Sequence, residues 1–261
     1  MGLIKNVVSG LRLFGIDPRI FMTSLRGLRF YFKDLSELKN QMGTDKLFPF
    51  GRKYPVLGDR NSEAGVMSGH YFHQDLFVAS KIYEACPIRH LDIGSRIDGF
   101  VAHVAIFREI EIMDIRPQIS KVKNIIFRQQ DLMQLPEHLN DSYDSISSLH
   151  VIEHFGLGRY GDPIDYNGYL KAIQNITSML KTGGVFYFSV PIGPQRIEFN
   201  GQRVFSVKYL LQIFKDDFFL NSFSYVDDAG DFFQNVTMPA ADIEKNFGCQ
   251  YGCGIFELVR K

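Results

Sequence analysis

The sequence predicts an α/β fold with a mostly parallel sheet, preceded by a helical N-terminal extension. Two observations support this prediction. Apolar residues recur at helical spacing in the first part of the chain, and from about residue 89 short β-like runs alternate with helical ones. Strands that alternate with helices form right-handed crossovers and a sheet covered on both faces. We therefore expect an extension over residues 1–70 and an α/β domain over residues 71–261.

The extension is predicted to contain two helices and a long connection. Apolar residues from Leu3 to Phe14 follow a helical period, and Asp17 followed by Pro18 suits the N-cap and first position of a second helix that runs to about Asn40. Glycines and prolines punctuate residues 43–69, which we expect to be irregular. A third helix is expected over Tyr71–Ala85, because one face carries Phe72, Leu76, Ala79 and Tyr83.

The α/β domain is predicted to contain seven strands with helices between them. The expected strands are His90–Ile93, Ile110–Asp114, Ile125–Arg128, Tyr143–Leu149, Gly184–Pro191, Phe218–Val226 and Gly254–Val259. The expected helices are Ile97–Phe107, Asp165–Lys181, with Gly183 as its C-cap, and Ser206–Phe214. Ligands of such sheets bind at the carboxyl ends of the strands.

Composition excludes several classes of protein. Hydrophobic residues make up 45 % of the 261, and 29 basic side chains balance 29 acidic ones, so no basic field indicates a nucleic-acid partner. The three cysteines are too few for a disulfide framework or a Cys-only zinc site, which favours reduced thiols. No apolar run approaches the roughly 18 residues of a membrane span, and the N-terminus lacks a secretory signal pattern. We expect a cytoplasmic protein.

Three acidic residues follow three successive predicted strands. Asp92 and Gly94 belong to a glycine turn after the first strand, where the backbone can approach a nucleotide-like ligand. Asp114 ends the second strand, where a carboxylate can accept hydrogen bonds from both ribose hydroxyls of an adenosine. Asp131 follows the third strand and can accept from an adenine amino group. Together the three acids predict a binding site for an adenosine-bearing ligand.

This order of features over roughly residues 88–260 resembles the class I S-adenosylmethionine-dependent methyltransferases. The resemblance implies a Rossmann-like, seven-stranded sheet with an antiparallel edge strand at Gly254–Val259, and S-adenosylmethionine as the cofactor. The loop departs from the usual pattern, since Arg96 and Asp98 stand where glycines are common and it is one residue longer. The cofactor-binding residues expected from the resemblance are Asp92, Gly94, Ser95, Arg96, Gly99, Asp114, Ile115, Asp131, Leu132 and Leu149.

Two further segments, residues 149–165 and 69–75, resemble a family known only as a domain of unknown function, whose bacterial members accompany surface-polysaccharide genes. That resemblance implies a sugar or glycan acceptor. The predicted function is therefore an O-methyltransferase of polysaccharide biosynthesis. The alternative is a non-catalytic protein that keeps the fold as a binding or scaffolding module in glycan assembly.

The loop after the fourth predicted strand carries the candidate catalytic residues. Transfer of a methyl group to a hydroxyl needs a base that removes the hydroxyl proton, and His154 suits this role at cytoplasmic pH. Glu153 or Asp162 can orient the imidazole or bind acceptor hydroxyls, and Arg159 can hold an anionic group. Further candidate acceptor contacts are Glu198, Phe199, Asn200 and Arg203, together with His70, His73 and Asp75 from the N-terminal side. No spacing demands a metal, and we predict none.

Other interpretations of these residues remain open. The three aspartates can simply cap helices and turns, and His154 can be a helix residue satisfied by backbone. A nicotinamide cofactor also uses a second-strand acid, but the Gly-x-Gly-x-x-Gly pattern is absent. Residues 150–154 match the His-x-x-Glu-His pattern of one zinc protease class, which requires a single helix, whereas His150 directly follows a predicted strand.

The N-terminal 33 residues carry six basic side chains and one acidic side chain among apolar residues. This pattern suits a helix on an anionic membrane surface and predicts peripheral contact with the inner membrane face through residues 1–33. The alternative is a solvated basic face of ordinary packing helices. The sequence does not indicate an oligomeric state.

Overall fold

The computed structural model describes residues 2–43, 47–134 and 139–261. The chain divides into two compact units, Met1–Val66 and Met67–Lys261. Within the described residues no helix is long and apolar enough to cross a membrane.

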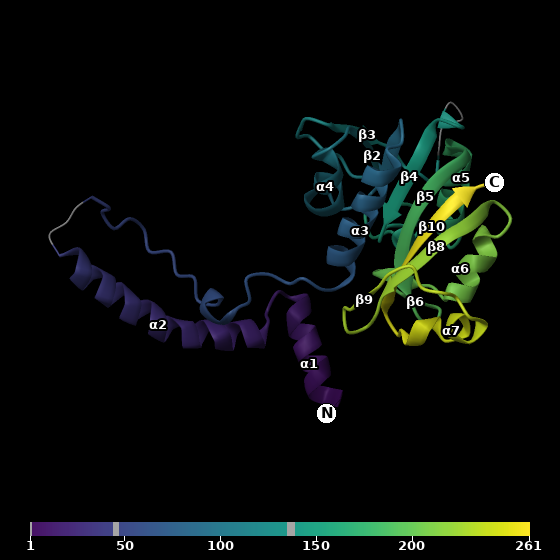
Figure 1. Cartoon of the computed structure of the whole chain (residues 1–261). Helices are drawn as coiled ribbons and strands as arrows, with labels where there is room; N and C mark the ends of the chain where they lie inside the picture. Colours follow the sequence, from purple (N-terminus) through teal and green to yellow (C-terminus); the bar gives the residue numbers. More distant parts are fainter. Residues whose placement is uncertain (1, 44–46, 135–138) are drawn as a thin grey trace. The chain divides into compact units, whose positions relative to one another are not determined.

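The N-terminal unit consists of helices α1 (Gly2–Leu13) and α2 (Pro18–Met42) and a chain segment that runs back along α2 (Figure 1). Asp17 caps α2 as predicted: its carboxylate accepts from the Arg19 N–H at 2.8 Å, and Pro18 opens the helix. Gly27 is the contact point for the returning segment, because a Cβ there would lie 2.2 Å from the carbonyl oxygen of Leu57. The predicted irregular connection contains the short 3₁₀ helix η1 (Asp59–Asn61), and its residues 44–46 lie outside the described residues.

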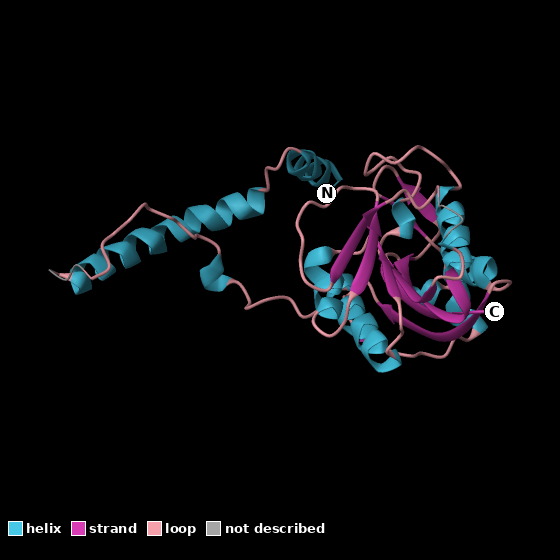
Figure 2. Cartoon of the chain, turned by 90° about the horizontal axis from the view of Figure 1, so that it is seen from above, coloured by secondary structure: helices cyan, strands magenta, loops and turns pink. Residues whose placement is uncertain are grey.

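The C-terminal unit is an α/β domain with helices on both faces of one sheet (Figure 2). The described strands form an eight-stranded sheet in the order β3-β2-β1-β4-β5-β10-β8-β9, and β6 and β7 form a separate hairpin. The sheet strands are β1 (His90–Ile93), β2 (Ile110–Asp114), β3 (Ile125–Gln129), β4 (Tyr143–Leu149), β5 (Leu180–Ile192), β8 (Phe218–Val226), β9 (Phe232–Phe233) and β10 (Gly252–Arg260). The hairpin strands are β6 (Arg196–Glu198) and β7 (Gln202–Val204).

The first five strands of this sheet are parallel, and β10 is antiparallel to both of its neighbours. The predicted fold class is therefore confirmed, and all seven predicted strands are present. Two details differ from the expectation. The final strand lies between β5 and β8 instead of at the edge, and the short β9 adds an eighth strand outside β8.

The sheet separates two hydrophobic cores because its side chains alternate between the faces. Along β5, Phe186 and Phe188 join the core under α5 and α6, whereas Tyr187 points to the core under α3 and α4. The helices of the unit are α3 (His70–Ala85), the π-helical η2 (Ile97–Val101), α4 (Ala102–Ala105), the 3₁₀ helix η4 (Ile152–His154), α5 (Gly168–Met179), α6 (Val207–Phe214), α7 (Ala240–Glu244) and the 3₁₀ helix η5 (Asn246–Gly248). Both cores contain completely buried apolar side chains, such as Ile146 in the first and Val78 in the second.

Three helix predictions need correction. Helix α5 ends at Met179, because Leu180 is already extended and begins β5, so Gly183 is not a helix cap. The predicted helix Ile97–Phe107 is one π-turn followed by the four residues of α4. The face of α3 expected from Phe72, Leu76 and Tyr83 is partly exposed. The buried face instead carries Gln74, Asp75, Val78, Ala79 and Ile82.

Candidate functional site

The turn after β1 is built around Asp92, whose side chain is completely buried. One carboxylate oxygen accepts from the Ser95 N–H at 2.9 Å, and the other accepts from the hydroxyls of Ser95 and Ser147, each at 2.7 Å. Burial raises the pKa of Asp92 to about 7, and these hydrogen bonds oppose the shift. Asp92 therefore fixes the turn from below and does not line the cavity above it.

A buried histidine extends this network into the sheet. The Ser147 hydroxyl donates its hydrogen to Asp92, so it can only accept from Nε2–H of His90, 3.1 Å away. Nδ1 of His90 is then the acceptor, and the Ser145 hydroxyl donates to it at 2.5 Å. Burial lowers the pKa of His90 to about 3, and Arg108 adds to the shift. The network thus needs a neutral His90 in one tautomer.

Gly94 is required in the same turn. Its φ is +63°, and a Cβ would lie 2.8 Å from a methyl carbon of Val151 and 3.8 Å from a carboxylate oxygen of Asp114. The backbone of the turn thereby approaches Val151, two residues after β4, at a distance that leaves no room for a side chain at Gly94.

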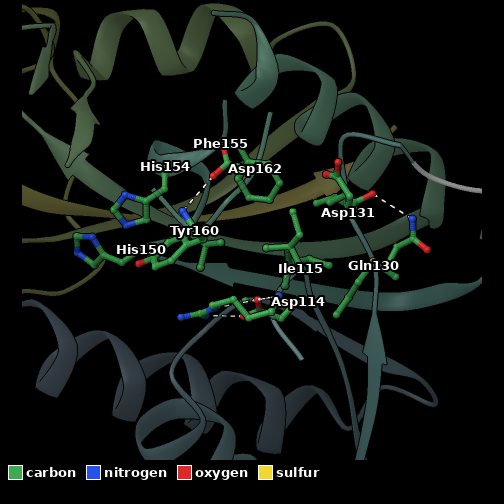
Figure 3. A pocket seen from close by; sticks show the side chains of 15 residues that line it. Asp114, Ile115, Gln130, Asp131, His150, His154, Phe155, Tyr160 and Asp162 are labelled. Carbon is green, nitrogen blue, oxygen red and sulfur yellow. Dashed lines mark hydrogen bonds and ion pairs between the residues drawn. The ribbon is translucent and has the colours of Figure 1, made fainter. Parts of the chain in front are cut away.

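A cavity of about 560 Å³ opens above these strand ends (Figure 3). In Figure 3 Asp131 lies at one end of the cavity, His150 and His154 lie at the opposite end, and Ile115 lies between them. The lining residues are Ile93, Gly94, Met113, Asp114, Ile115, Arg116, Gln130, Asp131, Leu132, His150, Val151, His154, Phe155, Tyr160 and Asp162.

A second hollow of about 940 Å³ shares several of these residues. It adds Ser95, Arg96 and Leu149, three of the expected cofactor residues, to Gly94 and Asp114. Gly99 lines neither hollow. A Cβ at Gly99 would lie 2.5 Å from a carboxylate oxygen of Asp75 on α3. Gly99 instead lets α3 approach the turn.

The carboxylate of Asp114 is engaged by Arg116, a residue that sequence reasoning did not single out. Asp114 accepts from the backbone N–H of Arg116 at 2.8 Å and from its guanidinium at 3.0 and 2.6 Å. The same guanidinium lies 4.5 Å from the ring centroid of Tyr160. A ligand that binds Asp114 must therefore share it with Arg116 or displace this cation.

The two ring nitrogens of His154 have different partners. Its Nδ1–H donates to the carbonyl oxygen of Gly201 at 2.7 Å, and its Nε2 lies 3.4 Å from Nη1 of Arg159 and 3.8 Å from Oε1 of Glu153. Burial lowers the pKa of His154, the Glu153 carboxylate opposes this shift, and the Arg159 guanidinium adds to it. The imidazole is therefore neutral at neutral pH.

The other two expected catalytic residues act on the loop itself. Glu153 is 1 % exposed, lines neither hollow, and accepts from Nδ1–H of His150 at 2.8 Å. Asp162 lines the cavity, but its carboxylate accepts from the backbone N–H groups of Gly156, Gly158 and Tyr160. Asp162 thereby holds residues 156–160 in a closed loop, as an N-cap side chain holds the first turn of a helix.

The candidate acceptor contacts from β6 and β7 also have structural partners. Arg203 is buried and donates to the carbonyl oxygens of Phe155 at 2.6 Å and Tyr166 at 3.1 Å. Glu198 forms an ion pair with Arg196 at 2.8 Å. Arg203 therefore holds the loop after β4 in place through backbone carbonyl oxygens.

One cluster was missed because its members are far apart in the sequence. His70, His150 and Cys253 place their ligand atoms within 4.8 Å of one another. They come from the start of α3, the turn after β4 and the start of β10. No spacing pattern in the sequence links such residues. The expected contacts Asp75 and His73 lie outside the cluster: Asp75 lies next to Gly99, and the ring of His73 stacks on that of Phe232.

The residues 150–154 do not form the single helix of a zinc protease. His150 has φ +56° in the turn after β4, and only Ile152–His154 are helical. A non-glycine residue in this region is uncommon and is held there by its surroundings. The turn brings His150 to Glu153, His70 and Cys253, and the same Glu153 oxygen, Oε1, also lies 3.8 Å from Nε2 of His154.

The sheet order and the position of the cavity define a Rossmann-like α/β domain of the methyltransferase type. A proposed sarcosine dimethylglycine methyltransferase from Galdieria sulphuraria is similar to this chain, with 15 % identity, coverage of 72 % of this chain and 85 % of that chain, and a TM-score of 0.50. The Burkholderia thailandensis 1,6-didemethyltoxoflavin-N1-methyltransferase, with bound S-adenosylhomocysteine, covers 77 % and 93 % at 15 % identity and a TM-score of 0.49. The N-methyltransferase NodS from Bradyrhizobium japonicum, also with S-adenosylhomocysteine, covers 86 % and 97 % at 14 % identity and a TM-score of 0.48.

The family of the chain follows from its sequence. The family model described as "Caenorhabditis protein of unknown function, DUF268" matches residues 102–245, more than half of the chain, so the chain belongs to this family. No curated protein matches the sequence.

The buried network around His90 predicts a pH-dependent stability. The pKa of His90 is about 3 in the folded chain and about 6.5 when unfolded, so its contribution is complete above pH 6.5 and is lost as the pH falls toward 3. The wild type should have a larger free energy of unfolding than His90→Gln at neutral pH. Below pH 6.5 we expect this difference to fall by up to about 1.4 kcal/mol per pH unit. Urea unfolding of both proteins from pH 7.5 to 4.5 measures this difference, and a constant difference contradicts the neutral His90.

Proposed function

We propose that this chain is an S-adenosylmethionine-dependent methyltransferase. The observation that supports this most is the cavity over β1, β2 and β4, which combines a glycine turn with carboxylates at the ends of two strands. Asp114 and Asp131 lie on its polar edge, and apolar side chains, including Ile115 and Leu132, form its wall. A nucleoside needs both of these features, since the ribose and adenine have polar edges and the adenine has an apolar face.

The residues fit the parts of the cofactor in order. Asp131 suits the adenine amino group, Asp114 suits the ribose hydroxyls once Arg116 moves, and the backbone of Gly94 suits the methionine part. When bound, S-adenosylmethionine supplies an activated methyl group on a sulfonium centre. The order of these residues brings that part of the ligand toward the end of the cavity where His154 lies.

We further propose that the acceptor is a hydroxyl group of a sugar or glycan. His154 Nε2 takes the hydroxyl proton, and the neutral state of this imidazole supports its role as the base. Arg159 lies beside His154, with its Nη1 3.4 Å from Nε2, and suits an anionic group such as a phosphate on the acceptor. The acceptor class rests on the resemblance of residues 69–75 and 149–165 to proteins of polysaccharide assembly.

Titration calorimetry tests the cofactor site. We expect S-adenosylhomocysteine to bind the wild type, and Asp114→Ala to weaken binding about 10–100-fold, because a hydrogen bond to a charged group contributes about 1.5–3 kcal/mol. Asp216→Ala, at an exposed acid outside both hollows, is the matched control and should bind as the wild type does. A folded wild type that binds neither S-adenosylmethionine nor S-adenosylhomocysteine at millimolar concentration contradicts the enzyme and supports a non-catalytic module.

Transfer of a labelled methyl group tests the base and the acceptor class. With wild-type protein we expect label in the glycan or glycolipid fraction of a cell extract. His154→Ala should lose about 10²–10⁴-fold in rate, as removal of a general base does, with unchanged affinity for S-adenosylhomocysteine.

His103→Ala is the control for this substitution, since the ring of His103 contacts the carbonyl oxygen of Gly99 outside both hollows. A His154→Ala protein that transfers methyl at the wild-type rate overturns the assignment of the base. Label that enters only protein or small molecules overturns the glycan acceptor.

We also propose that the N-terminal unit contacts an anionic membrane surface at the cytoplasmic face. Leu13 and Phe14 are more than four-fifths exposed, and Arg12 and Arg19 lie near them on α1 and α2. Apolar side chains interspersed with cations suit such a surface.

Flotation of the full chain with vesicles tests this contact. We expect binding to vesicles that contain phosphatidylglycerol and little binding to phosphatidylcholine alone. The double substitution Leu13→Ser and Phe14→Ser should abolish flotation, while Phe48→Ser, at an equally exposed position outside the helices, should not. Equal flotation of all three proteins contradicts membrane contact through α1.

A further inference from the structure

We propose that His70, His150 and Cys253 form a zinc site at the border of the cavity, with three protein ligands and one open coordination position. The ligand atoms of the three residues lie within 4.8 Å of one another. In a tetrahedral zinc site, with Zn–N near 2.0–2.1 Å and Zn–S near 2.3 Å, ligand atoms are about 3.4–3.6 Å apart. Closure by about 1 Å through side-chain rotation therefore completes the site.

The strongest evidence is an unsatisfied atom in the cluster. The side chain of His150 is 4 % exposed, and among the described residues its Nε2 has no hydrogen-bond partner. Buried polar atoms almost always have a partner, so an orphaned one requires an explanation. A metal ion bound by Nε2 provides it.

The other nitrogen of His150 is already oriented as in a metal site. Nδ1–H donates to Glu153 Oε1 at 2.8 Å, which leaves Nε2 as the ring nitrogen that can bind a metal ion once it has lost its proton. Histidine ligands of zinc usually donate their second N–H to a carboxylate in this way. Glu153, which does not reach the cavity, thereby acquires a role as a positioning residue.

His70 and Cys253 complete a donor set that zinc prefers. Cys253 is completely buried at the start of β10. Two imidazoles and one thiolate suit zinc, whereas magnesium and calcium prefer oxygen ligands.

The same residues also resemble a thiol–imidazole–carboxylate triad, in which Cys253 would be a nucleophile. Two features favour the metal. A nucleophile must reach its substrate, but Cys253 has no exposed surface. A triad also has no use for His70, whose ring stacks on that of His150 with a centroid distance of 5.1 Å.

The site adjoins the proposed acceptor end. His150 lines both hollows, and Tyr71, next to His70, lines the second one. Three protein ligands with an open position are typical of catalytic zinc sites, where the open position takes water or substrate. A cation here would favour acceptors with an oxygen ligand, and this part of the inference rests on the proposed function.

Titration of the metal-free, reduced, full-length protein with Co²⁺ tests the site. We expect one equivalent to bind, with the visible absorption of tetrahedral cobalt and a thiolate-to-cobalt charge-transfer band, and Zn²⁺ should displace it, as expected from its higher affinity. Cys253→Ser should remove the charge-transfer band, and His70→Ala should weaken binding at least 10-fold. His70 is the first residue of α3, and its side chain is half-buried.

Matched controls separate ligation from a general effect on folding. Cys249→Ser removes another buried thiol and His73→Ala another histidine of α3, and both should bind Co²⁺ as the wild type does. Glu153→Gln should keep the charge-transfer band but weaken binding about 10–100-fold, as is usual for the carboxylate partner of a ligating histidine. Circular dichroism checks that each variant is folded.

The inference is overturned if the folded wild type binds no stoichiometric Co²⁺ or Zn²⁺, or if the band persists in Cys253→Ser. Fast alkylation of Cys253 in wild type that binds no metal would identify a nucleophile instead. Calorimetry with S-adenosylhomocysteine on the same samples separates the two proposals. Cofactor binding without metal overturns only the zinc site, and metal binding without cofactor overturns only the methyltransferase.

Discussion

The hydrogen bonds to the buried carboxylate of Asp92 hold together everything that the cavity depends on. They join the end of β1 to Ser95 in the turn and to Ser147 on β4, and the Ser95 hydroxyl also accepts from the Leu149 N–H at 3.2 Å. These bonds compensate the carboxylate for its burial, which would be costly if it had no partners. The position of Gly94, and with it the floor of the cavity, follows from this network.

A second set of buried polar contacts ties α3 to the same edge of the sheet. Gln74 accepts from the Ser189 hydroxyl at 2.6 Å, and its amide donates to Asp75 at 3.2 Å. Asp75 then reaches the turn at Gly99. Helix α3 therefore docks through polar partners as well as through Val78 and Ile82, and this docking brings His70 to His150.

The features that follow from local pattern could be predicted from the sequence, and those that depend on tertiary partners could not. The seven strands were found because apolar runs and turn residues mark them, and the cap at Asp17 follows from its neighbours. The buried face of α3 was missed because Gln74 and Asp75 look like surface residues until Ser189 and Gly99 are known. Similarly, Asp92 was expected to contact a ligand, because the sequence does not show that Ser147 occupies its carboxylate.

The ion pair of Arg116 and Asp114 has a consequence for selectivity. A ligand at Asp114 does not meet an unpaired carboxylate. The hydrogen bonds that it makes to Asp114 therefore contribute to binding only to the extent that they are stronger than those that Arg116 loses. A molecule with a single hydroxyl gains little in this exchange. A ribose, with two adjacent hydroxyls, can replace both contacts of the guanidinium at once. If Asp114 binds the cofactor as proposed, Arg116 competes for the same carboxylate, and the site selects ligands by the number and spacing of their donors.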